Sequence, residues 1–167
     1  MQKYLDLKHM EPTYYTPRLT TKLRVVFNAS ACLPRQTSLN DHLLSGPKLQ
    51  RDPVTILLSF QLYPFVLTAD IKMIYQQILV RDAHCVYQRL IWSFSPQDPF
   101  QDYRLKTVTY GISSAPYLAI RVLLKLVDLE GSSFSLAATA LRNDTYIDDV
   151  VTGCWSYSDA LSICACA

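Results

Sequence analysis

The sequence lacks the patterns that mark zinc-binding, secreted or membrane-spanning proteins. Its five cysteines include no CxxC pair and its three histidines are scattered, so a structural zinc site is not expected. Free intracellular thiols are the simplest reading of an odd cysteine count. The first residues hold no apolar signal core, and no apolar run approaches the length of a bilayer span. Internal repeats and low-complexity segments are also missing.

The composition leaves one globular domain as the expectation. The chain has 167 residues, half of them apolar and 18% charged, which is enough for a core and too apolar for disorder. A net charge of +2 permits nucleic-acid binding but does not argue for it.

Local patterns predict a mixed α+β chain. Residues 65–70 are a continuous apolar run, which favours a buried central strand. Residues 103–110 form the longest alternating strand, with Arg104 and Lys106 on one face. The helix that follows Pro116 is apolar on most sides and is expected to be buried against the sheet. Further elements are expected as a turn of helix after Ser38, a helix from Asp52-Pro53 to before Pro64, a helix turn from Asp82, strands at 21–27 and 91–94, a helix at 135–142 and a hairpin at 146–152.

The hairpin carries an acid pair, Asp148 and Asp149, between β-branched and aromatic neighbours. Two like charges side by side are costly unless a cation lies between them, and Mg²⁺ prefers oxygen ligands of this kind. A solvated turn is the alternative, because Asp is common in turns. A third acid, Asp70, ends the apolar strand, where a carboxylate is either a cap or a ligand. If the hairpin pairs beside that strand, the three carboxylates converge, as two Mg²⁺ ions about 3.5–4 Å apart require for phosphoryl transfer.

Two further features have open readings. Lys22 and Arg24 project to the same side of the strand at 21–27, either as a solvated face or as contacts to phosphates. Tyr75, five residues after Asp70, is by default a core aromatic.

The order of these blocks resembles a reverse transcriptase. LTADI at 67–71 with YQQI at 75–78, YRL at 103–105 with TYG at 109–111, and YIDD at 146–149 carry the likeness. TKLRVVF at 21–27, SLND at 38–41 and SAP at 114–116 are similar to the Bel/Pao group of LTR retrotransposons. The likeness covers residues from about 4 to about 153.

The resemblance implies a right-hand polymerase with fingers, a ferredoxin-like palm sheet and no thumb. It divides the chain into an N-terminal arm at 1–20, a fingers and palm domain at 21–153 and a truncated tail at 154–167. It also implies two Mg²⁺ ions (Mn²⁺ as a substitute), deoxynucleotides, a primed RNA or DNA template, the remaining parts of a Pol polyprotein and a cytoplasmic retrotransposon particle. No membrane partner is implied.

The resemblance also assigns roles to residues. Asp70 and Asp148 would be the main metal ligands and Asp149 the third catalytic carboxylate. Tyr75 would be a steric gate that excludes a ribose 2′-hydroxyl. The implied substrate contacts are Lys22 and Arg24 at the triphosphate, and Tyr110 and Gly111 near the template and nucleotide.

Two other functions stay open. The segment between residues 15 and 20 is shorter than in the family, and thumb and RNase H sequences are absent, which favours a retrotransposon relic that keeps the palm fold without activity. The other alternative is a nucleic-acid-binding module without chemistry.

Overall fold

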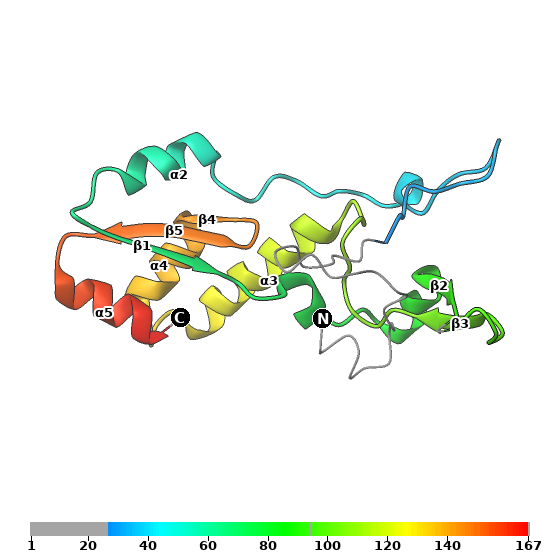
Figure 1. Ribbon diagram of the computed structural model, residues 1–167. Coiled ribbons are helices and arrows are strands. Elements are labelled where there is room, and N and C mark those ends of the chain that lie inside the picture. Colours follow the sequence, from blue (N-terminus) through cyan, green and yellow to red (C-terminus); the bar gives the residue numbers. More distant parts are fainter. Residues whose placement is uncertain (1–26, 94, 167) are drawn as a thin grey trace.

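The computed structural model describes residues 27–93 and 95–166, and they form a mixed α+β structure with two small antiparallel sheets (Figure 1). The elements, in chain order, are η1 (Asn40–His42), α2 (Pro53–Phe60), β1 (Phe65–Asp70), η2 (Ile74–Gln77), η3 (Asp82–Tyr87), β2 (Arg89–Trp92), β3 (Gln101–Arg104), α3 (Ala115–Glu130), α4 (Ser135–Asn143), β4 (Thr145–Tyr146), β5 (Asp149–Cys154) and α5 (Tyr157–Cys166), where η denotes a 3₁₀ helix. Residues 21–26 of the predicted first strand, with Lys22 and Arg24, lie outside the described residues.

The larger sheet has the strand order β1-β5-β4, and all of its pairings are antiparallel. The register between β1 and β5 runs from Phe65 opposite Cys154 to Asp70 opposite Asp149. In Figure 1 helix α2 lies above this sheet and helices α4 and α5 lie below it, and all three contact β5. The hairpin predicted at 146–152 is therefore present, and it pairs beside the strand that ends in Asp70.

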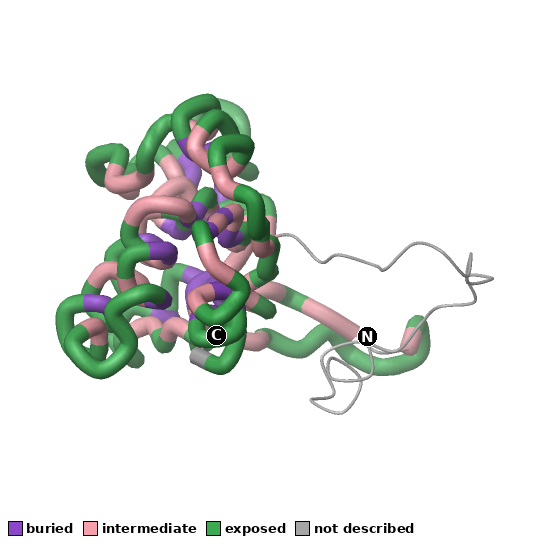
Figure 2. The backbone as a smooth tube through the Cα atoms, turned by 90° about the vertical axis from the view of Figure 1, so that its left-hand side faces the viewer, coloured by how far each residue is buried: buried purple, intermediate pink, exposed green. Residues whose placement is uncertain are grey.

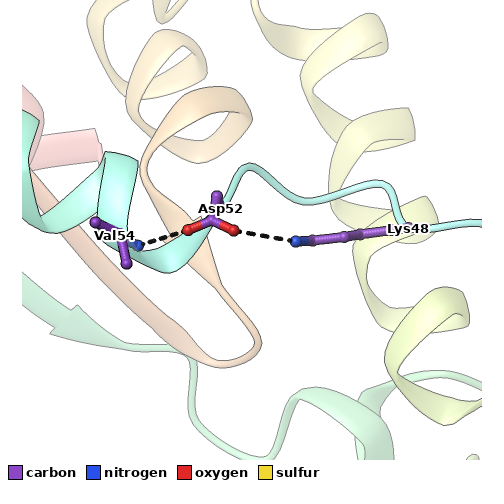
Figure 3. A network of polar contacts seen from close by, with 3 residues as sticks. All are labelled: Lys48, Asp52 and Val54. Carbon is purple, nitrogen blue, oxygen red and sulfur yellow. Dashed lines mark hydrogen bonds and ion pairs between the residues drawn. The ribbon is translucent and has the colours of Figure 1, made fainter.

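Helix α2 begins where its local signals place it. The Asp52 side chain accepts a hydrogen bond of 3.0 Å from the Val54 amide, and Pro53 occupies the first turn, where its missing N–H costs nothing. Lys48 Nζ lies 3.6 Å from the other Asp52 oxygen (Figure 3). Helix α3 likewise has Pro116 in its first turn and ends at Gly131, but the Ser114 hydroxyl makes no capping bond.

The main core lies around η2 and the first turns of α3. Its buried members are Ala29, Ile74, Tyr75, Val108, Ile112, Ala115 and Ala119. Figure 2 shows buried residues at several separate places along the chain, with exposed residues around them. A smaller cluster joins Cys154 of β5 to Ala160 and Ile163 of α5. Helix α5 therefore packs on the sheet, although sequence patterns predicted no element in the tail.

Two burial predictions are wrong. Strand β1 lies at the edge of its sheet rather than in the centre, and Phe65 and Val66 are 39% and 48% exposed. Helix α3 contacts α4 and η2 on one side, while Val122, Leu126 and Leu129 remain exposed on the other. Apolar periodicity identified both elements correctly, but it does not report how many neighbours cover them.

The strand predicted at 103–110 is interrupted. Only β3 pairs with β2, and the chain then changes partner. The Leu105 amide still donates to the Gln88 carbonyl, whereas the Val108 amide donates to the carbonyl of Ile78. An alternating pattern cannot reveal this switch, because it leaves the side-chain period unchanged.

Candidate metal centre

The acid pair lies at a tight hairpin turn. Ile147 and Asp148 connect β4 to β5, since Tyr146 is paired with Asp149 across the turn. Ile147 has a φ of 58°, which is unusual for a β-branched residue and costs about 1–3 kcal/mol. Its side chain packs against the main core, which helps to hold the turn in this conformation. The turn therefore presents two consecutive carboxylates from a constrained backbone.

Strand β1 brings the third carboxylate to the same point. Asp70 lies directly opposite Asp149 at the end of the β1–β5 ladder. One residue further, the Ile71 amide donates a 2.7 Å hydrogen bond to the Asp148 carbonyl. Backbone pairing thus fixes Asp70 against both residues of the acid pair.

One carboxylate oxygen from each of Asp70, Asp148 and Asp149 can be chosen so that all three lie within 4.8 Å of one another. Asp148 is half-buried and the other two are exposed. A donor set made only of carboxylate oxygens suits a hard divalent ion such as Mg²⁺ or Mn²⁺ rather than zinc. The residues present therefore fit the expected metal.

Tyr75 lies in the main core next to this site. It is 6% exposed, and its ring meets that of Tyr110 edge to face, with 4.8 Å between centroids. Burial first, then the negative charge of Asp148 and the neighbouring Tyr110, raise the pKa of the Tyr75 hydroxyl above its ordinary value. The structure thus gives Tyr75 the core position of the default reading, and it also places it close to the acids.

Tyr110 and Gly111 are held by contacts that sequence reasoning missed. Asn40 donates a 2.9 Å hydrogen bond to the Gly111 carbonyl and accepts one of 2.9 Å from the Ser113 amide. The Phe27 amide donates to the Tyr110 carbonyl at 3.1 Å. Gly111 has a φ of 96°, which favours glycine. In the sequence, SLND at 38–41 indicated only a turn of helix, and nothing local pointed to contacts 71 and 73 residues away.

Asp144 supports the base of the hairpin and was also missed. Its carboxylate accepts a 2.7 Å hydrogen bond from the Thr152 hydroxyl, and its carbonyl accepts a 2.8 Å bond from the Val151 amide. Arg51 lies 3.8 Å from the same carboxylate. An isolated Asp before a strand carries no sequence signal for this role.

No protein-family model matches the sequence, and no curated protein matches it either. The case for a function therefore depends on the residues of the site and on their geometry. None of the described helices is long and apolar enough to cross a lipid bilayer.

Proposed function

We propose that this chain is the fingers and palm part of an RNA-directed DNA polymerase of the Bel/Pao retrotransposon type. The observation that carries the proposal is the gathering of Asp70, Asp148 and Asp149 within 4.8 Å. They come from a strand end and a hairpin turn, which are the places where the resemblance expects them.

In this proposal, Asp70 and Asp148 hold the metal ions and Asp149 completes the negative pocket. Bound Mg²⁺ would neutralise charge at the phosphates and lower the pKa of the primer 3′-hydroxyl. The half-buried position of Asp148 supports its assignment as a main ligand, because a charge with less water around it interacts more strongly with an ion.

The substrate contacts follow from the neighbours of the acids. Tyr75 selects deoxynucleotides by its bulk, Tyr110 and Gly111 line the nucleotide, and Lys22 and Arg24 contact the triphosphate. The contact between the rings of Tyr75 and Tyr110 supports the roles proposed for these two residues, because it places both side chains near Asp148. The remaining partners are a primed RNA or DNA template and the other parts of a Pol polyprotein. Binding to a primed template depends on many phosphate contacts, so this segment alone should hold it weakly.

Primer extension with Mg²⁺ or Mn²⁺ tests the proposal. Asp148→Asn should abolish incorporation, whereas the matched Asp98→Asn variant, which removes an exposed acid outside the site, should not. Tyr75→Val should raise incorporation of ribonucleotides relative to deoxynucleotides. Incorporation that survives in Asp148→Asn would exclude the proposed centre. Absence of incorporation by the unaltered chain together with binding of Mn²⁺ would favour an inactive relic.

A further inference from the structure

A second group of charged residues comes from η3, from the end of β3 and from the segment that follows β3. A cavity of about 330 Å³ is lined by Asp82, Cys85, Arg104 and Lys106, none of which belongs to the acid site. This volume is at the lower end of the range for small-ligand pockets, about 300–1,000 Å³. Arg104 and Lys106 are the cationic pair that the alternating pattern placed on one face, and the proposed polymerase chemistry does not use them.

The two cations have no anionic partner within the described chain. Four ion pairs occur among residues 27–93 and 95–166, and none of them includes Arg104, Lys106 or Asp82. Arg104 and Lys106 are both exposed, so a ligand in solution can reach their charged groups. Within the described part of the chain, the cavity therefore presents two positive charges and one negative charge that form no ion pair.

The pairing of β2 with β3 places a second positive charge opposite Arg104. Arg104 lies directly opposite Arg89 in the register, and like charges in this position destabilise a strand pair. Asp102 neutralises Arg89 by an ion pair and a hydrogen bond. Among residues 27–93 and 95–166, no acid forms an ion pair with Arg104. An anion bound at Arg104 would remove this imbalance.

Hydrogen bonds connect the segments that line the cavity. Buried Cys85 lies at 3.6 Å from the carbonyl oxygens of Val80 and Arg81, and its thiol donates to them. The Val80 amide donates to the Lys106 carbonyl at 2.9 Å. Backbone bonds thus fix the origin of the Lys106 side chain relative to η3, which lowers the entropy lost when a ligand binds.

We propose that this cavity binds the phosphate group of a nucleotide. A guanidinium can form a fork to two phosphate oxygens, and an ammonium adds a point charge. Asp82 weakens binding of bare phosphate, and it suits a phosphate whose attached group carries a hydroxyl or amino donor. Nucleotides have this combination, whether free or within a strand.

The test uses the full chain and two probes, dAMP and a fluorescein-labelled single-stranded oligodeoxynucleotide. The test variant is Arg104→Gln with Lys106→Gln. The control is Arg121→Gln with Lys125→Gln on the exposed face of α3, which changes the net charge equally. Fluorescence anisotropy follows the strand, and the shift of the thermal midpoint follows dAMP. Loss of the one phosphate contact should reduce the slope of log affinity against log salt by about 0.7 on a single strand.

Binding that weakens about tenfold or more in the test variant and less than about threefold in the control supports the site. Binding of the oligonucleotide alone then identifies a strand as the source of the phosphate, and an equal response to dAMP identifies a free nucleotide. Equal weakening in both variants indicates general electrostatics and overturns the proposal, as does the absence of any binding by the unaltered chain.

Further variants and the choice of buffer keep the result independent of folding and of the polymerase proposal. The single changes Arg104→Gln and Lys106→Gln replace the double variant if it does not unfold cooperatively, and Lys106→Arg should retain most of the binding. Both probes are measured in chelator, so that no divalent ion can hold them at Asp70, Asp148 and Asp149. A failed primer-extension assay would therefore leave the outcome at this cavity unaffected.

Discussion

Replacing Asp148 with Asn should stabilise the metal-free protein while removing its response to divalent ions. Asn keeps the size of the side chain and leaves the backbone bond from the Ile71 amide in place. The substitution removes one of three charges whose oxygens lie within 4.8 Å. Stability and ion response should therefore change in opposite directions, which a simple loss of packing cannot produce.

The magnitude follows from the separation. Two unit charges 4.8 Å apart repel by about 1 kcal/mol in water and by about 3–4 kcal/mol at an effective dielectric constant of 20. Asp70 and Asp149 are exposed, so the lower value applies to each pair. Relief of the two pairs that involve Asp148 should raise the free energy of unfolding by about 1–2 kcal/mol. In a chain of this size, each kcal/mol corresponds to about 2–4 °C in Tm.

Thermal unfolding with chelator and with Mg²⁺ or Mn²⁺ measures both effects. The unaltered protein should gain about 1.4 kcal/mol when the free ion is at ten times its Kd, and Asp148→Asn should gain much less. Salt near 1 M should shrink the difference in chelator, because the screening length falls to about 3 Å. Asp98→Asn is the control and should behave like the unaltered protein. A lower Tm for Asp148→Asn in chelator, with an unchanged response to the ions, would refute this reasoning.

Three further predictions concern other parts of the structure. Asp144→Ala should lower the free energy of unfolding in urea by about 1–3 kcal/mol, because the buried Thr152 hydroxyl loses its acceptor. Gly153→Ala should cost about 1–3 kcal/mol, because the added Cβ would lie 2.6 Å from Tyr63 Cβ. Tyr75→Phe should reduce the loss of stability above pH 10. Because the pKa of Tyr75 is raised in the folded protein, folded Tyr75 keeps its proton at a pH where the unfolded chain has released it. The free energy of unfolding of the unaltered protein therefore falls as pH rises from about 10 towards the folded pKa.

Each of these predictions has its own control. The double change Asp144→Ala with Thr152→Val should cost less than the sum of the single changes, and full additivity would mean that the two side chains are not coupled. Gly153→Ala combined with Tyr63→Ala should likewise recover part of the loss. For the alkaline scan, Tyr87→Phe at an exposed position is the reference, and identical pH profiles for the two Phe variants would contradict the effect of burial on Tyr75.

Much of the secondary structure can be predicted from the sequence, because the residues that specify each helix or strand end lie within a few positions of it. The Asp52-Pro53 pair identified the start of α2, and Gly131 identified the end of α3. The β-branched residues around the acid pair predicted the hairpin. Caps and periodicity act over one or two turns, so they survive whatever the rest of the chain does.

The errors share one physical cause. Strand β1 was expected to be central, and the segment 103–110 was expected to be one strand. Both depend on which distant segments supply hydrogen-bond partners. The roles of Asn40 and Asp144 were missed for the same reason, since their partners are selected by the packed structure.

For the candidate centre, the sequence by itself determined which residues are acids, that two of them are adjacent, and that local propensity bends the chain into a turn beneath them. Only the tertiary structure decided that Asp70 stands opposite Asp149 and that one oxygen from each of the three carboxylates lies within 4.8 Å of the others. A hairpin is a local event, whereas the register between β1 and β5 joins residues about 80 positions apart and is selected by the packing of α2, α4 and α5 on the sheet.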